Sequence, residues 1–289
     1  MSLSFLSECK EKVFNRIDSL LPDTNKIASS MRYSALADSK CIRAGLIFAS
    51  GNLNKEITNS ALIDMAASIE LMHTYSLIHD DLPSMDNDEM RRGQASNHIK
   101  FNEATAILTG DALQALAYEN IVSSPEITQS QKISSIKALS NACGHEGMIL
   151  GQQFDLDAEN NSYNDIKKIH ELKTGRLIRV AITMPHLGNE NQKNQLIVLD
   201  EVGRDLGLAF QIIDDVLEVS SDSSTLGKSN QSDLMNEKLT YVSAFGKQAS
   251  IDQAHALSNA CISKLESSFH KNEVAELLEL ARFMVERKS

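Results

Sequence analysis

Residues 62–80 read LIDMAASIELMHTYSLIHD, and apolar side chains recur in this stretch at steps of three and four residues. The stripe consists of Leu62, Met65, Ile69 and Met72. This spacing predicts an amphipathic helix that buries one face. At about 100° per residue Asp80 returns to that face, so an aspartate ends a stripe that otherwise faces the core. A buried carboxylate needs a compensating charge, which makes this helix end a candidate binding site.

A second stripe with the same period runs through residues 202–217, and Asp214 and Glu218 lie beside it. The 289 residues include only 13 glycines and 4 prolines, too few for the many tight turns of a β-sandwich or β-barrel. Hydrophobic residues make up 42% of the sequence, which is ample for a core. We therefore expect an all-α protein that forms a single domain over residues 1–289.

The net charge of −11 argues against extended binding to nucleic acid, because phosphate backbones attract basic surfaces. No apolar run approaches the roughly 18 residues of a membrane span, and the N-terminal sequence lacks the regions of a secretory signal. The four cysteines are scattered and form no CxxC pair, so neither a disulfide framework nor structural zinc is expected. These features favour a cytoplasmic protein.

The first of two acidic clusters is DDLPSMDND at residues 80–88. Asp80 and Asp86 would point about 120° apart on an unbroken helix. Pro83 makes an unbroken helix unfavourable, and a bulge there would bring Asp86 back beside Asp80.

The second acidic cluster is DDVLE at residues 214–218. Asp214 and Glu218 are four residues apart and share one helix face, which suits a hard divalent cation such as Mg²⁺. Solvated acidic helix ends are the simpler interpretation of either cluster alone. Two clusters, each beside a core-facing stripe, favour a metal site.

Basic residues accompany both clusters. They are Lys40, Arg43, Arg91, Arg92, Lys173, Lys228 and Lys238. Each one alone is more simply a surface charge. Together with Mg²⁺ they suit a ligand with more negative charge than a single phosphate, such as a diphosphate.

Several ordered motifs resemble those of the trans-isoprenyl diphosphate synthases. SLIHDDLPSMDNDEMRRG and FQIIDDVLEV are similar to the two aspartate-rich motifs of this family, and the spacing from Asp80 to Asp86 looks like its bacterial farnesyl diphosphate synthase branch. The likeness also covers MRYSAL, KFNEATAILTGDALQ, GQQFDLDAE and HELKTGRLIR, from about residue 31 to residue 241. The resemblance implies a helical bundle of the isoprenoid synthase type around a central apolar cavity.

The resemblance also implies an activity: head-to-tail condensation of isopentenyl diphosphate with dimethylallyl and geranyl diphosphate to give farnesyl diphosphate. Three Mg²⁺ ions per active site, replaceable by Mn²⁺, are expected on Asp80, Asp86 and Asp214. Asp81 and Lys173 complete the expected catalytic set. The residues expected at the allylic diphosphate are Arg91, Lys173, Thr174, Gln211, Lys228 and Lys238. Those expected at isopentenyl diphosphate are Lys40, Arg43, His73 and Arg92.

Product length in the family depends on the residues four and five positions before the first aspartate pair, here Ser76 and Tyr75. A bulky Tyr75 is expected to stop growth at fifteen carbons. Residues 104–117 are apolar on nearly all sides, which, with the resemblance, predicts a homodimer. A helix at the centre of the bundle would explain the same pattern.

The loop DSKCIRA at residues 38–44 departs from the family pattern Gly-Gly-Lys-Arg-x-Arg-Pro. Asp38 is expected to repel a phosphate and Cys41 supplies no charge, so we expect weaker capture of isopentenyl diphosphate here. The alternatives are a geranyl or geranylgeranyl diphosphate synthase, or a degenerate subunit without catalysis. A metal phosphohydrolase with a His79–Asp80 pair is disfavoured, because it needs further upstream histidines.

Overall fold

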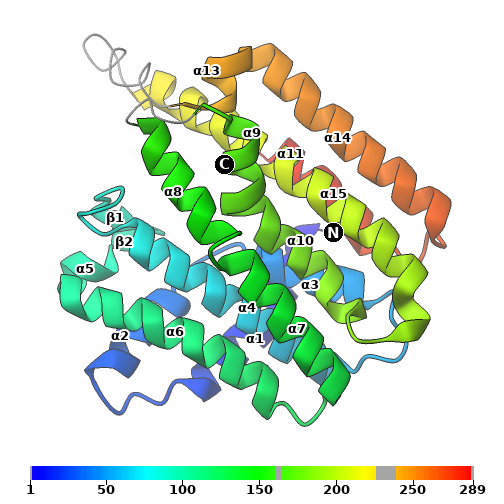
Figure 1. Ribbon diagram of the computed structural model, residues 1–289, viewed down its shortest axis with the longest axis horizontal. Helices are drawn as coiled ribbons and strands as arrows, with labels where there is room; N and C mark the ends of the chain where they lie inside the picture. The colour runs from blue at the N-terminus through cyan, green and yellow to red at the C-terminus, as the bar shows by residue number, and fades with distance from the viewer. Residues whose placement is uncertain (1, 160–163, 226–238, 288–289) are drawn as a thin grey trace. The chain divides into compact units, whose positions relative to one another are not determined.

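The computed structural model describes residues 2–159, 164–225 and 239–287, which are almost entirely helical (Figure 1). Contacts between residues group the chain into two compact units, residues 1–137 with 184–190 and residues 138–183 with 191–289. The single domain over residues 1–289 stays a prediction. Within the described residues, we find no helix that combines the length and the apolar character needed to cross a membrane.

The first unit consists mainly of helices and includes one short hairpin at its edge (Figure 1). Its elements are α1 (Ser2–Leu20), α2 (Lys26–Ala35), α3 (Ile42–Gly51), α4 (Asn59–Asp80), β1 (Met90–Arg91), β2 (Gln94–Ala95), α5 (Asn97–Lys100), α6 (Glu103–Ser123), the start of α7 (Gln129–Cys143) and the short η2 (Met184–His186). Helices α4 and α6 lie side by side (Figure 1).

Helix α4 is the helix predicted from the first stripe. Thr58 caps its N-terminus, because the Thr58 side chain accepts a hydrogen bond from the backbone N–H of Ala61 at 3.1 Å. The predicted stripe residues Leu62, Met65, Ile69 and Met72 are all buried. Asn120 of α6 donates to the carbonyl oxygen of Asp64 at 2.7 Å and so ties the two helices together. The prediction of a core-facing helix that ends at Asp80 is confirmed.

The hairpin of β1 and β2 was not predicted from the sequence. Arg92 and Gly93 form its two-residue turn with φ of 52° and 76°, the left-handed conformation that such tight turns require. Tyr33 of α2 donates from its hydroxyl to the carbonyl oxygen of Ala95 at 2.8 Å and holds the hairpin against α2. The hairpin therefore fixes the position of the arginine pair that follows the first acidic cluster.

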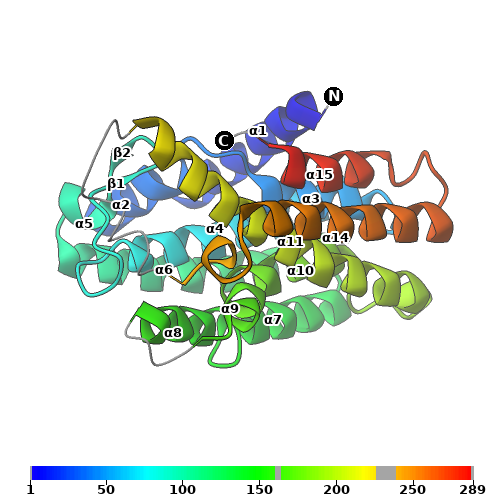
Figure 2. The ribbon, with the colours of Figure 1, turned by 90° about the horizontal axis from the view of Figure 1, so that it is seen from above.

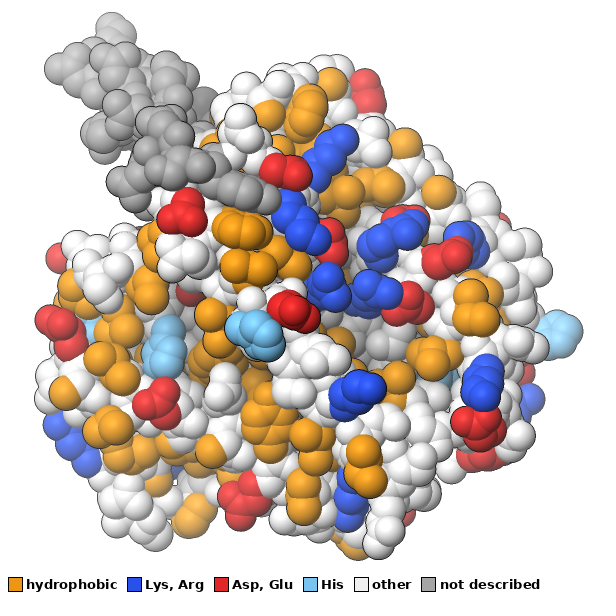
Figure 3. Space-filling model, viewed as in Figure 1, with side chains coloured by type: hydrophobic (Ala, Val, Ile, Leu, Met, Phe, Trp, Pro, Cys, Tyr) orange, Lys and Arg blue, Asp and Glu red, His pale blue; other side chains and the backbone are white. Residues whose placement is uncertain are grey.

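Helix α6 is only partly buried within its unit. Leu113 and Ala117 are buried, but Ile107 is 45% and Leu108 is 55% exposed. Hydrophobic side chains reach the surface along this helix (Figure 3). Burial at the centre of the first unit therefore does not account for the apolar character of residues 104–117.

The second unit is built around one long helix. Its elements are the end of α7, α8 (Met148–Glu159), α9 (Ile166–His170), the π-helix η1 (Glu171–Gly175), α10 (Arg176–Thr183), η3 (Glu190–Gln192), which begins at the unit boundary, α11 (Lys193–Thr225), α13 (Tyr241–Phe245), α14 (Lys247–Ser268) and α15 (Ala275–Glu286). Helices α14 and α15 lie beside α11 (Figure 2). The predicted stripe on α11 faces the core, since Val202, Leu206, Phe210 and Ile213 are buried.

Candidate active site

The first acidic cluster lies where α4 ends and the chain reverses. The backbone N–H of Asp86 donates to the carbonyl oxygen of Asp80 at 2.9 Å, and that of Asn87 donates to Leu82 at 3.1 Å. The predicted bulge at Pro83 is therefore present, and it returns the backbone of Asp86 to Asp80. Asp86 is exposed and Asp80 is partly exposed, so both carboxylates can reach a ligand.

Asp81 and Arg91, both predicted at the ligand site, bind each other. Arg91 donates to one carboxylate oxygen of Asp81 from Nε at 2.9 Å and from Nη2 at 2.5 Å, and it also reaches Asp88 at 2.8 Å. Burial raises the pKa of Asp81 above its usual value, although Arg91 opposes this shift. The ion pair orients the guanidinium of Arg91, and the catalytic role of Asp81 stays a prediction.

Three of the residues predicted to bind isopentenyl diphosphate are electrostatic neighbours in the first unit. Burial lowers the pKa of His73 well below its ordinary value, and the charges of Arg43 and Arg92 lower it further. His73 is therefore neutral at pH 7 and offers a hydrogen bond rather than a charge. The fourth residue, Lys40, is exposed on the loop before α3.

The loop that departs from the family pattern has a local explanation. Cys41 precedes α3 in a left-handed backbone conformation with φ of 46°, and its side chain is only 3% exposed. The backbone N–H of Ala44 donates to the buried carboxylate of Glu70 at 2.9 Å. Since Cys41 is buried, the structure does not support the idea that its replacement of an arginine removes a contact with the diphosphate.

Asp38, which was expected to repel a phosphate, forms an ion pair with Lys10 of α1. This contact lowers the pKa of Asp38, and the charge of Arg92 contributes to the same effect. The lysine offsets the charge of Asp38, so the expected repulsion is reduced. Lys10 was missed because it lies 28 residues away and belongs to no motif.

In the second acidic cluster, Asp214 is held by Arg287, which directly follows α15. Arg287 pairs with the carboxylate of Asp214, donates to the carbonyl oxygen of Phe210 at 3.2 Å and stacks 3.8 Å above the Phe210 ring. Burial lowers the pKa of Arg287, while Asp214 opposes this shift. Glu218 lies one turn further along α11 and is exposed. Nothing in the sequence indicated Arg287.

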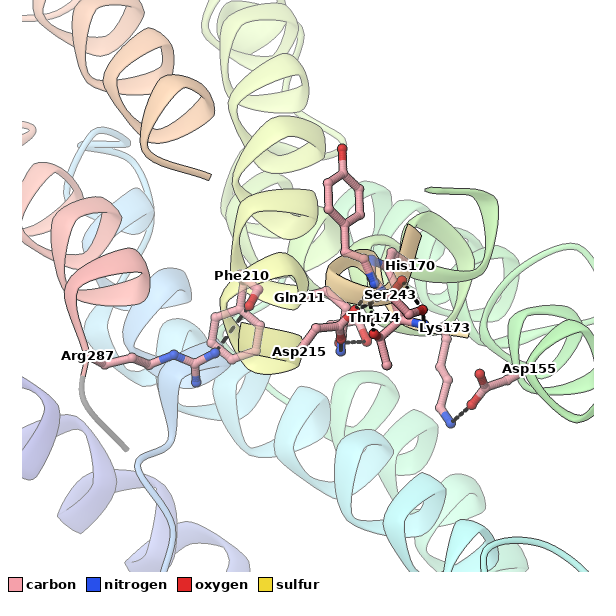
Figure 4. A network of polar contacts seen from close by, with 11 residues as sticks. Asp155, His170, Lys173, Thr174, Phe210, Gln211, Asp215, Ser243 and Arg287 are labelled. Carbon is pink, nitrogen blue, oxygen red and sulfur yellow. Dashed lines mark hydrogen bonds and ion pairs between the residues drawn. The ribbon is translucent and has the colours of Figure 1, made fainter. Parts of the chain in front are cut away.

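The π-helix η1 carries two residues predicted at the allylic diphosphate (Figure 4). Lys173 binds the carboxylate of Asp155 on α8 at 2.7 Å, and the hydroxyl of Thr174 donates to the side-chain oxygen of Gln211 at 2.7 Å. Helices of this kind are frequent at functional sites. Lys173, Thr174 and Gln211 therefore lie close together, and their role at the allylic diphosphate stays a prediction. Lys228 and Lys238, from the same predicted set, lie outside the described residues.

The two residues predicted to set product length differ in environment. Tyr75 is buried and packs edge-to-face against His79, with ring centroids 5.8 Å apart. His79 in turn lies 3.1 Å from the carbonyl oxygen of Ile107, so Tyr75 is part of the packing between α4 and α6. Ser76 is partly exposed and donates to the carbonyl oxygen of His73 at 2.9 Å.

The donor chemistry of the acidic clusters fits Mg²⁺. Asp80, Asp86 and Asp214 offer carboxylate oxygens, the ligands that a hard cation prefers. Within the described residues no three acidic, histidine or cysteine side chains gather closely enough to cage an ion. Mg²⁺ does not need such a cage, because it keeps water and takes one or two carboxylates together with substrate phosphate oxygens.

Comparison with known proteins agrees with this geometry. A family model described as Polyprenyl synthetase matches residues 24–280. The farnesyl diphosphate synthase of Escherichia coli K12 is 38% identical over 283 residues, which cover 96% of this chain and 94% of that protein. The geranylgeranyl diphosphate synthase of Cyanophora paradoxa is also 38% identical, over 99% of this chain and 97% of that protein. The chain therefore belongs to the polyprenyl synthetase family.

Solved structures give the same result. An FPP/GFPP synthase from Zymomonas mobilis superimposes with a TM-score of 0.87 at 32% identity, over 99% of this chain and 100% of that one. The geranyltransferase of Helicobacter pylori, complexed with magnesium and isoprenyl diphosphate, gives a TM-score of 0.81 at 30% identity, over 98% and 96% of the two chains. The predicted all-helical fold of the isoprenoid synthases is confirmed.

Proposed function

We propose that this chain is a prenyltransferase that condenses isopentenyl diphosphate head-to-tail with dimethylallyl diphosphate and then with geranyl diphosphate. The products are farnesyl diphosphate and diphosphate, and the reaction belongs to isoprenoid biosynthesis. One observation carries the proposal. Two acidic clusters, each beside cationic side chains, occur in a sequence 38% identical to the E. coli farnesyl diphosphate synthase.

The allylic diphosphate is held by both acidic clusters and their cations. Asp80, Asp86 and Asp214 hold Mg²⁺, for which we propose three ions and replacement by Mn²⁺. When bound, the metal supplies Lewis-acid stabilisation of the departing diphosphate. The side chains that bind the diphosphate itself are Arg91, Lys173, Thr174, Gln211, Lys228 and Lys238. Asp81 and Asp155 hold Arg91 and Lys173 in place, so these cations are oriented before the substrate arrives.

The second substrate, isopentenyl diphosphate, binds to Lys40, Arg43, His73 and Arg92. The C–O bond of the allylic substrate breaks, and the diphosphate keeps its electron pair. The double bond of isopentenyl diphosphate then attacks the allylic carbon, and a proton passes from the new chain to the departing diphosphate. No nucleophilic side chain is needed. The side chains bind and orient the two diphosphates and keep water from the cation inside an apolar cavity.

We also propose that the protein is a homodimer and works in the cytoplasm. The exposed apolar side chains of α6, Ile107 and Leu108, support the dimer because such a surface is expected to be covered. The four cysteines are buried and form no disulfide, which agrees with a reducing compartment.

The test is a product assay of the purified protein with Mg²⁺, labelled isopentenyl diphosphate and either allylic primer. We expect a fifteen-carbon product after dephosphorylation and no product with EDTA. Tyr75→Ala should lengthen the product to twenty carbons or more, because loss of the buried ring leaves an apolar gap. Tyr75→Phe serves as the control, since it keeps the buried ring and removes only the hydroxyl group.

The assay also separates the alternatives. A twenty-carbon product from the unmodified protein would favour a geranylgeranyl diphosphate synthase, like the relative from Cyanophora paradoxa. A ten-carbon product would favour a geranyl diphosphate synthase. No product with either primer would favour a degenerate subunit, for which the altered loop at residues 38–44 is the supporting observation.

A further inference from the structure

The buried carboxylate of Asp215 joins three elements of the second unit (Figure 4). Its Oδ2 accepts the backbone N–H of Tyr241, the first residue of α13, at 2.6 Å, and lies 3.2 Å from Nε2 of His170 at the end of α9. Its Oδ1 accepts the side-chain amide of Gln211, one turn earlier on α11, at 3.2 Å. Asp215 and His170 are each only 4% exposed, so these groups replace water around the carboxylate.

The ring of His170 is fixed by packing as well as by this contact. It stacks on the ring of Tyr241 with an angle of 21° between the planes. Its Nδ1 is buried and has no hydrogen-bond partner among the described residues. Because a carboxylate accepts hydrogen bonds, Nε2 carries a proton in this contact and His170 donates to Asp215. The Nε2 donor is therefore engaged by the carboxylate.

Asp215 also orients the residues proposed to bind the allylic diphosphate, because it accepts a hydrogen bond from the side-chain amide of Gln211. Because the nitrogen of the Gln211 amide donates to Asp215, its oxygen is left to accept from another group. That oxygen accepts the hydroxyl of Thr174 at 2.7 Å. Thr174 follows Lys173 in η1, so the chain of contacts ends at two residues of the proposed site.

We infer that His170 is a positioning residue for the allylic diphosphate site, acting through Asp215 and Gln211 on Thr174 and Lys173. Asp215 is then an internal anchor of the second acidic cluster, while its partly exposed neighbour Asp214 is the proposed metal ligand. The inference rests on the proposed function, because it assumes that Thr174, Lys173 and Gln211 bind the allylic substrate. His170 itself touches no substrate.

The experiment compares two substitutions in the full chain. His170→Phe keeps an aromatic ring on Tyr241 but removes the donor to Asp215, whereas His170→Gln restores an N–H near the position of Nε2. We expect His170→Phe to raise the KM for geranyl diphosphate about tenfold or more, because a buried carboxylate loses a hydrogen bond. The KM for isopentenyl diphosphate should stay within about twofold, since its proposed residues lie in the first unit. His170→Gln should recover most of the loss.

A second measurement does not depend on turnover. Isothermal titration calorimetry of geranyl diphosphate with Mg²⁺ should show the same rise in Kd for His170→Phe. The double variant that combines His170→Phe with Asp215→Asn should raise the Kd by less than the sum of the two single effects, because both substitutions break the same chain of contacts. His98→Phe is the matched control, since His98 is a buried histidine of the first unit without a hydrogen-bond partner among the described residues.

Three outcomes would overturn the inference. The first is an unchanged KM for geranyl diphosphate in a folded His170→Phe variant of an active protein. The second is equal impairment of both KM values together with a lower melting temperature in His170→Phe and His170→Gln alike, which would indicate a purely structural role. The third is an unmodified protein that makes no product. This result would overturn the proposed function as well, and the reaction rate of the unmodified protein distinguishes it from the other two outcomes.

Discussion

At the scale of single residues, one buried carboxylate interacts with both positions 41 and 44, where the sequence departs from the family pattern. Glu70 is 5% exposed and accepts the backbone N–H of Ala44. The family pattern has a proline at this position, which has no N–H, and an arginine at the position of Cys41. Burial first, and then the charge of Glu70, raise the pKa of the Cys41 thiol to about 12. Since the charge of Glu70 acts on position 41, we expect the residues at positions 41 and 44 to be energetically coupled.

This link gives a prediction for the free energy of unfolding. Ala44→Pro suits the first turn of α3 but removes the donor to Glu70, which should lower the free energy of unfolding by about 1–3 kcal/mol. Adding Cys41→Arg should recover much of this loss, because the guanidinium supplies new donors. Urea denaturation of the two single variants and the double variant measures the coupling. Equal losses in Ala44→Pro and in the double variant would show that the positions are independent.

At the scale of elements, the π-helix η1 depends on close backbone packing from both sides. A Cβ atom on Gly151 of α8 would lie 2.3 Å from the backbone nitrogen of Lys173. A Cβ atom on Gly207 of α11 would lie 2.8 Å from the Cα of Gly175. Both glycines are needed because no side chain fits between the helices at these points. The position of Lys173 therefore depends on residues outside its own motif.

Gly151→Ala should displace η1 and impair the proposed allylic site. We expect a loss of about 1–3 kcal/mol in the free energy of unfolding, and a higher KM for geranyl diphosphate. The matched control is Gly175→Ala, whose Cβ would meet nothing closer than the carbonyl oxygen of His170 at 3.3 Å. Melting curves and steady-state kinetics of both variants provide the measurement. If Gly151→Ala kept the free energy of unfolding and the KM of the unmodified protein, α8 and η1 would be able to move apart without a loss of stability, which would contradict the prediction.

The elements also show what could be predicted from the sequence. Periodic stripes predicted α4 and the buried face of α11, and Pro83 predicted the turn that returns Asp86 to Asp80. These features depend on residues close together in the chain. The contacts of Lys10 and Arg287 join residues 28 and 73 positions apart, and no local pattern marks either residue. The hairpin at Arg92 escaped prediction because its strands have only two residues each.

At the scale of the whole molecule, the outer face of α6 leads to a prediction about assembly. Ile107, Leu108 and Val122 are 45%, 55% and 53% exposed and lie on one side of the helix. If this surface joins two copies of the chain, Leu108→Asp should shift the protein from dimer to monomer at micromolar concentration, because a charge would be buried without a partner. Light scattering after size-exclusion chromatography measures the mass.

Ile133→Asp on α7 is the control for this prediction, since Ile133 is 70% exposed and lies on another helix. It should leave the dimer intact. A monomeric mass for the unmodified protein, or dissociation by both substitutions alike, would contradict the proposed interface.

The burial of the cysteines also bears on how this protein can be studied. Cys9, Cys41, Cys143 and Cys261 are each at most 3% exposed. Burial raises the pKa of Cys41 and Cys261 to about 12, so at pH 7 only about one in a hundred thousand of these thiols is ionised. Maleimide dyes and spin labels attack the thiolate and need access to it. A single cysteine introduced at the surface would therefore take up a fluorescent or paramagnetic reporter selectively, with the native cysteines left in place.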